Sequence, residues 1–183
     1  MKQTLRAKPP SRQEIEEAIF NVQDIRDKAL IATLYLTGGR ISEVLKLYRE
    51  DLSFQKLEER EYLVVKLQTL KRKKGVEERL IPIPTREPLL QYLIQWLSFV
   101  KLGQPVFYSY HNPDKPIDRH QAWRIIKKAS EKLWCHLLRH GRLSELATEM
   151  TAFELQQFAG WSDVRPALYY VSLDWKQLAR KIE

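Results

Sequence analysis

Three strand-like runs lie between segments of helical periodicity, and they restrict the fold more than any other feature of the chain. The runs are Leu52 to Phe54, Tyr62 to Leu70 and Arg79 to Ile83, and each is mostly apolar. The last two flank a basic segment, Lys71-Arg72-Lys73-Lys74-Gly75, which reads as the tip of a hairpin. The pattern predicts a small antiparallel sheet of about three strands.

Helix signals occupy most of the remaining sequence. Ser11-Arg12-Gln13-Glu14 is a capping box that opens a helix through Phe20, and Gly38-Gly39 ends a second helix that begins near Val22. Residues Gly103 to Pro116 read as a loop, with Val106-Phe107 as a short extended piece. Further helices are predicted over Ile41–Leu47, from Pro88 to Val100, from Asp118 to Leu133, and over His136–Glu149, Thr151–Ala159, Asp163–Val171 and Leu173–Ile182. The expected fold class is mainly α with a small antiparallel three-stranded β-sheet.

The chain has 183 residues, the length of one domain with a sizeable core. Residues 1–10 are basic and contain prolines, so we interpret them as a linker or arm that precedes a domain over residues 11–183. The net charge of +8 favours a polyanionic partner, chiefly DNA or RNA. The single cysteine, Cys135, rules out an internal disulfide and fits a reducing compartment. The sequence has no signal peptide and no apolar run that could span a bilayer, so we expect a cytoplasmic protein without membrane contact, associated with the nucleoid.

Five polar or aromatic side chains, scattered along the sequence, match the chemistry of phosphodiester cleavage without a metal. The five are Arg40, His136, Arg139, Trp161 and Tyr170. Two guanidinium groups can bind the two non-bridging oxygens, where charge grows in the transition state. A histidine three residues before Arg139 lies on the same helix face and can move a proton near neutral pH. The phenol, with a pKa of about 10, is the nucleophile we expect, and the indole N–H can only donate.

The leaving 5′ oxygen also needs an acid, and the hairpin tip supplies candidates. A lysine there can reach into DNA and deliver a proton. Counting back from Arg79 favours Lys74 as this acid, whereas a one-residue difference in the hairpin favours Lys73. The other basic residues of the hairpin are expected DNA contacts, which gives the set Lys71, Arg72, Lys73, Lys74 and Arg79.

The order of these pieces resembles the catalytic domain of the tyrosine recombinase (phage integrase) family. The resemblance rests on Thr37-Gly38-Gly39-Arg40-Ile41-Ser42-Glu43, Arg79-Leu80-Ile81-Pro82, His136-Leu137-Leu138-Arg139-His140, Gly160-Trp161-Ser162, and a tyrosine nine residues after Trp161. It covers nearly the whole chain from Ser11 onward. It implies a recombinase or integrase of a mobile genetic element, archaeal or viral, that acts on double-stranded DNA through a 3′-phosphotyrosyl intermediate. It further implies a homo-oligomer on DNA, a tetramer in the synapse.

Several positions depart from the family pattern. Trp161 replaces the commoner histidine, and some members carry tryptophan there. Gly141 replaces the usual threonine after Leu138-Arg139-His140, and glycine inside a helix costs about 1 kcal/mol relative to alanine. Tyr169 precedes Tyr170, so the choice of nucleophile rests on spacing. Members usually carry an additional N-terminal core-binding domain, which we expect to be absent from this chain, either because it is a fragment or because it is a minimal member.

The remaining residues have less specific explanations. Glu43 is expected to orient Arg40, and His140 is expected to be a supporting, structural histidine. His136 and His140 are four residues apart, but Leu137 stands where a metalloprotease needs glutamate, so we expect no metal and no other cofactor. Two rival functions stay open: a type IB topoisomerase-like activity, which rejoins the original strand, and a DNA-binding module without catalysis.

Overall fold

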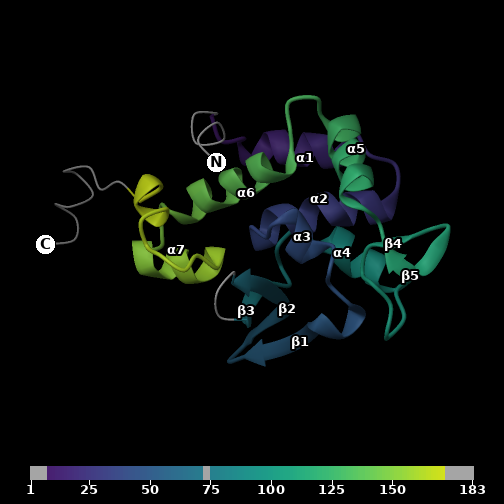
Figure 1. The fold of residues 1–183 in the computed structure, drawn as a ribbon, viewed down its shortest axis with the longest axis horizontal. Helices are drawn as coiled ribbons and strands as arrows, with labels where there is room; N and C mark the ends of the chain where they lie inside the picture. Colours follow the sequence, from purple (N-terminus) through teal and green to yellow (C-terminus); the bar gives the residue numbers. More distant parts are fainter. Residues whose placement is uncertain (1–7, 72–74, 172–183) are drawn as a thin grey trace, which may run out of the picture.

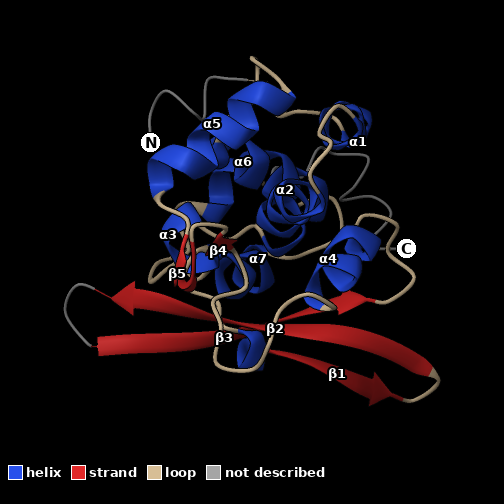
Figure 2. Ribbon diagram, turned by 90° about the vertical axis from the view of Figure 1, so that its right-hand side faces the viewer, coloured by secondary structure: helices blue, strands red, loops and turns tan. Residues whose placement is uncertain are grey.

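The computed structural model describes residues 8–71 and 75–171. Helices cover one face of a three-stranded antiparallel sheet, as Figure 2 shows. The strands β1 (Leu52–Leu57), β2 (Arg60–Lys71) and β3 (Gly75–Pro84) lie in the order β1-β2-β3. The prediction of a mainly helical fold with one small sheet of this kind is therefore confirmed.

The β2–β3 hairpin keeps its register from Tyr62↔Pro84 to Lys71↔Gly75. Alternate residues of β2 and β3 turn toward the helices and are buried, because successive side chains of a strand point to opposite faces. These inward residues are Leu63, Val65, Leu67, Ile81 and Ile83. The basic tip 72–74, which carries Arg72, Lys73 and Lys74, lies outside the described residues.

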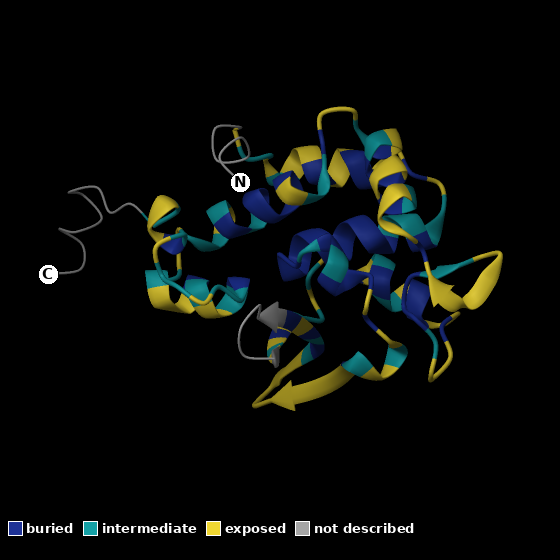
Figure 3. Cartoon of the chain, viewed as in Figure 1, coloured by how far each residue is buried: buried dark blue, intermediate teal, exposed yellow. Residues whose placement is uncertain are grey.

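Helix α2 (Ile25–Thr37) is the central element of the core, and Figure 3 shows how much of it is buried. Helices α4 (Leu90–Leu97) and α6 (Cys135–Leu146) pack against it. The helix ends at Gly38, whose positive φ of 55° is the left-handed conformation that glycine tolerates best. This turn brings the chain directly to Arg40.

Local sequence signals set the ends of several other helices. Helix α1 (Arg12–Phe20) begins with the predicted capping box of Ser11 and Glu14, and Asp118 caps α5 (Arg119–Ala129). The chain also forms α3 (Ile41–Val44), α7 (Ala152–Ala159) and the 3₁₀ turn Arg49–Asp51. In the described part of the chain, no helix combines the length and hydrophobicity that crossing a bilayer requires.

A second, smaller core lies beside the main one and contains Leu143, Leu155, Ala159 and Ala167. It joins α6 to α7 and to the 3₁₀ turn Ala167–Tyr169. Figure 1 shows α7 at one end of the molecule and the ribbon of β4 (Tyr108–Ser109) and β5 (Asn112–Pro116) at the other, with α6 leading toward α7.

Several predicted elements differ from the structure. The helices predicted over 41–47 and from Asp118 to Leu133 end at Val44 and Ala129. The loop predicted over 103–116 contains a two-stranded ribbon, β4 (Tyr108–Ser109) with β5 (Asn112–Pro116), whose strands are too short to show periodicity. The helix predicted over 136–149 ends at Leu146. The helix predicted over 163–171 is reduced to Ala167–Tyr169, because Pro166 supplies no N–H and the Asp163 carboxylate instead accepts the Arg165 backbone N–H at 2.7 Å. The helix predicted over 173–182 lies outside the described residues.

Candidate active site

The first part of the site is the turn that carries Arg40. The Glu43 carboxylate accepts the Arg40 backbone N–H at 2.8 Å and the Arg40 Nη1 group at 2.6 Å. Glu43 is buried, whereas Arg40 is about one-third exposed. One carboxylate thus fixes both the backbone and the guanidinium of Arg40, which agrees with the orienting role expected of Glu43.

Arg79 approaches the same carboxylate from strand β3. Its Nη2 donates to Glu43 Oε2 at 2.8 Å, and its Nη1 donates to the Thr69 hydroxyl on β2. Burial alone would raise the pKa of Glu43, but the hydrogen bonds and charges of Arg79 and Arg40 hold it below its ordinary value. The side chain of Arg79 is only 9% exposed, so most of its surface is used inside the protein and not on a DNA-facing surface.

Gly160 makes room for the Arg79 guanidinium at the end of α7. A Cβ atom at this position would lie 2.6 Å from Arg79 Nη1 and 3.0 Å from the Thr69 hydroxyl oxygen. Gly160 also takes a positive φ of 63°, which ends the helix and directs the chain into Trp161. Glycine in the Gly160-Trp161-Ser162 motif therefore has a steric cause as well as a conformational one.

Arg139 lies at the junction of the two cores. It projects from α6, is 7% exposed, and donates from Nη1 to the Gly38 carbonyl and from Nη2 to the Ala159 carbonyl at 2.8 Å. Burial and repulsion from Arg40 lower the pKa of Arg139 below its ordinary value, while the Glu43 charge opposes this shift. An arginine starts from so high a pKa that it remains a cation at neutral pH.

Tyr170 lies against His140 and Trp161. Its hydroxyl is 3.1 Å from His140 Nδ1, and its ring stacks on Trp161 with the centroids 5.8 Å apart. The Arg139 guanidinium lies 5.5 Å from the centroid of the same indole. Burial raises the pKa of the Tyr170 phenol, and the Arg139 charge reduces the effect. By contrast, Tyr169 is 72% exposed.

His136 occupies the first turn of α6 and its side chain is exposed. Partial desolvation, followed by the charges of Arg139 and Arg40, lowers its pKa. The imidazole is therefore biased toward the neutral form, which can accept a proton. His136 borders a different cavity from the one beside Arg40, next to α5.

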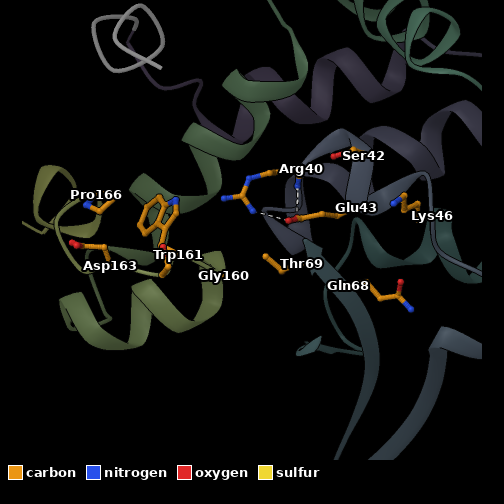
Figure 4. A pocket seen from close by; sticks show the side chains of 11 residues that line it. Arg40, Ser42, Glu43, Lys46, Gln68, Thr69, Gly160, Trp161, Asp163 and Pro166 are labelled. Carbon is orange, nitrogen blue, oxygen red and sulfur yellow. Dashed lines mark hydrogen bonds and ion pairs between the residues drawn. The ribbon is translucent and has the colours of Figure 1, made fainter. Parts of the chain in front are cut away.

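An open cavity of about 260 Å³ lies between the Arg40 turn and the Trp161 segment. Figure 4 shows Arg40 and Trp161 on facing walls of it, with the Arg40 guanidinium extending toward the indole. Lys46 and Gln68 line the side nearest the sheet. Two cations, Arg40 and Lys46, and two carboxylates, Glu43 and Asp163, line the cavity, which is open to solvent.

The structure thus brings together Arg40, Arg139, Trp161 and Tyr170, with His140 in direct contact with the tyrosine. The lysines proposed as the general acid, Lys73 and Lys74, lie outside the described residues, as does Arg72, and the Lys71 backbone pairs with Gly75 at the end of the hairpin. Sequence reasoning missed the Arg79–Glu43 pair, because the two residues are 36 positions apart and Arg79 belongs to a basic stretch that suggested DNA contact. Among the described residues, no three potential metal ligands converge.

This architecture, a mainly helical domain with a small three-stranded antiparallel sheet, is that of tyrosine recombinase catalytic domains. A crystal structure of XerA recombinase matches it with a TM-score of 0.69 and 21% identity over 96% of this chain and 64% of that chain. The XerH site-specific recombinase matches with a TM-score of 0.67 and 20% identity over 97% of this chain and 55% of that chain.

Sequence comparison makes the assignment specific. The model of the phage integrase family matches residues 11–177, and the chain belongs to this family, as the motifs predicted. Tyrosine recombinase XerA of Pyrococcus furiosus is 28% identical over 166 residues, which are 87% of this chain and 54% of that protein. Tyrosine recombinase XerD of Staphylococcus epidermidis is 26% identical, over 94% of this chain and 61% of that protein. The chain therefore spans a little over half the length of these relatives.

Proposed function

We propose that this chain is the catalytic part of a site-specific DNA recombinase that cuts and rejoins strands through a 3′-phosphotyrosyl intermediate. The observation that carries the proposal is the contact of Tyr170 with both His140 and Trp161, because the same indole also lies beside the Arg139 guanidinium and lines the cavity that contains Arg40. Trp161 thus links the expected nucleophile to the two expected cations. Proteins of the same fold have been solved with DNA, including XerH with a difH substrate and the Tn1549 transposon integrase with circular intermediate DNA.

Cleavage begins with attack of the Tyr170 oxygen on the scissile phosphorus. The new O–P bond replaces the bond from phosphorus to the 5′ oxygen, so the 3′ end is joined to the enzyme and a 5′-hydroxyl is released. Arg40 and Arg139 stabilise the charge on the non-bridging oxygens, and the Trp161 N–H assists. The leaving oxygen takes its proton from Lys74 or Lys73.

The phenol proton needs an acceptor because a phenol is protonated at neutral pH, and burial raises the pKa of Tyr170 further. His140 Nδ1, at 3.1 Å, is within transfer distance, and a neutral imidazole with its proton on Nε2 has the required lone pair. His136 remains the second candidate, since its lowered pKa also favours the neutral form. In the joining step a 5′-hydroxyl from another duplex attacks the phosphotyrosine, and the proton returns to Tyr170.

Covalent trapping tests the proposal directly. Wild-type protein on a suicide substrate, in which the released 5′ end diffuses away, should give a protein–DNA adduct that survives denaturation. Tyr170→Phe should bind the DNA and give no adduct, whereas Tyr169→Phe, at the exposed neighbour, should give the wild-type amount. Adduct formation by Tyr170→Phe but not by Tyr169→Phe would reassign the nucleophile, and no adduct from the wild type would leave a DNA-binding module.

Further assays separate the finer parts of the proposal. Because guanidinium groups supply the charge, adduct formation should persist in excess chelator, and its loss there would indicate a metal requirement. Exchange of strands between two duplexes distinguishes a recombinase from a type IB topoisomerase, which would relax supercoiled plasmid without exchange.

We also propose that the protein assembles as a homo-oligomer on double-stranded DNA, a tetramer when two sites are joined, in association with the nucleoid. Light scattering of the protein with paired sites would show only monomers if this assembly does not form.

A further inference from the structure

A second cavity, of about 570 Å³, lies between α5 and the start of α6, and of its lining residues only His136 has a part in the cleavage chemistry above. Its volume is within the range of about 300–1,000 Å³ that is typical of small-ligand pockets. His136 lies at its edge and Ile41, the neighbour of Arg40, contributes to its wall. The cavity therefore adjoins the site where the scissile phosphate is expected to bind.

One stripe of α5 supplies most of the lining. Arg119, Trp123 and Lys127 are spaced four residues apart, so they lie on one face of the helix. Trp123 is 47% exposed, although indole rings of soluble proteins are usually well covered. The Lys127 ammonium lies 5.8 Å from the ring centroid of Trp134, the second indole in the cavity.

The charge of the cavity has one sign. The lining residues are Ile41, Arg119, His120, Trp123, Lys127, Trp134, Cys135 and His136, and none of them is acidic. Helix α5 itself has no acidic residue between its first and last positions. An exposed aromatic face beside cations that can bind phosphate is the combination by which proteins hold single-stranded nucleic acid.

We propose that this cavity binds one unpaired nucleotide of the cleaved DNA strand, with its base stacked on Trp123 and its phosphate bound by Arg119 and Lys127. The occupant must be unpaired, because a base inside a duplex already has both faces covered by its neighbours. Strand exchange creates such bases, since the released end must leave one duplex before it joins another. This inference rests on the proposed function and adds to it a site for the strand in transit.

The experiment couples Trp123 to single bases of the substrate. Abasic residues are placed one at a time beside the cut, and the ratio of exchanged product to covalent adduct is measured for wild type, Trp123→Ala and Trp123→Phe. In the wild type, one abasic position should lower this ratio about tenfold, the size of one aromatic–base stack. Trp123→Ala should lower it to the same extent on intact DNA, with no further loss at that abasic position, and Trp123→Phe should recover most of the ratio.

Phe99→Ala is the matched control, because Phe99 is also an exposed aromatic residue but does not line the cavity. The proposal would be overturned if Trp123→Ala and each abasic position lowered the ratio of exchanged product to covalent adduct independently and additively. A wild-type ratio for Trp123→Ala would overturn it too. If the wild type forms no adduct, the proposed function fails and the cavity is tested by equilibrium binding. The measured quantity is then the affinity for DNA with one unpaired base divided by the affinity for full duplex. This quotient should be about tenfold larger for the wild type than for Trp123→Ala. The same quotient for both proteins would refute the site.

Discussion

Arg79 donates a 2.8 Å hydrogen bond to Glu43, the residue whose carboxylate also holds Arg40. The pair joins strand β3 to the helix that follows the Arg40 turn. Strand β3 follows the hairpin tip, which carries the predicted general acid, Lys74 or Lys73. Through Arg79 and Glu43 the same strand also supports Arg40, which lines the cavity. Arg79 is therefore better described as a positioning residue than as a simple DNA contact.

Replacing Arg79 should impair both stability and catalysis. Arg79→Ala leaves the buried Glu43 carboxylate with fewer partners, and breaking a buried ion pair costs about 3–5 kcal/mol of unfolding free energy. Arg79→Lys keeps the charge but loses the fork that reaches Thr69 and Glu43 together, so its loss in chemical denaturation should be smaller. Single-turnover cleavage should fall in the same order. A normal cleavage rate for folded Arg79→Ala would show that Arg40 needs no such support.

The pKa of Glu43 predicts acid sensitivity. Its folded-state pKa lies below the ordinary value of 4.5, so the ionised carboxylate stabilises the native state. This contribution is fully present above pH 4.5 and is lost as the pH falls through the lowered folded-state value. Carbon-detected NMR titration of the Glu43 carboxyl group should give a midpoint below 4.5. A midpoint at or above this value would mean that burial outweighs the two arginines.

Tyr170 should ionise later than an ordinary phenol. Burial raises its pKa, so the difference in phenolate absorbance between wild type and Tyr170→Phe should have its midpoint above about 10. A raised pKa means that the neutral phenol stabilises the native state. This contribution to the free energy of unfolding is complete below pH 10 and is lost as the pH rises through the folded-state pKa. A midpoint below 10 would indicate that Arg139 dominates the environment of the phenol.

Gly141, one of the positions that depart from the family pattern, packs against Pro10. A Cβ atom there would lie 2.9 Å from Pro10 Cγ and 3.2 Å from the Pro10 carbonyl oxygen. Overpacking costs about 1–3 kcal/mol, whereas alanine gains about 1 kcal/mol of helix propensity. We therefore expect Gly141→Ala to be destabilising in thermal denaturation, and Pro10→Ala to relieve part of that loss in the double variant. A more stable Gly141→Ala would show that the Pro10 contact is weak.

The parts of the fold that the sequence predicts well are those with local causes. The Ser11 capping box and the alternation of β2 and β3 each depend on neighbouring residues, and they appear as expected. Arg40 and Arg139 were recognised through motifs whose residues lie close in sequence. The ribbon at Tyr108 and the ion pair of Arg79 could not be found in this way, because one has strands of only a few residues and the other joins distant segments.

Gly141 and His140 are two more residues whose roles depend on contacts with residues distant in sequence. Propensity alone makes a glycine inside α6 a defect, and only the position of Pro10 gives it a reason. His140 was expected to be structural, and nothing in its neighbours along the chain indicated that its ring nitrogen would meet the Tyr170 hydroxyl, 30 residues later. Contacts of this kind depend on how two cores pack, which periodicity does not encode.

The two carbonyl groups that Arg139 binds come from different parts of the molecule, the turn after α2 and the last residue of α7. The guanidinium thus acts as a clasp between the large core and the small one that carries Tyr170. Both contacts exist only while the two cores are packed together, so loosening the small core would also remove the guanidinium from its place beside the Trp161 ring.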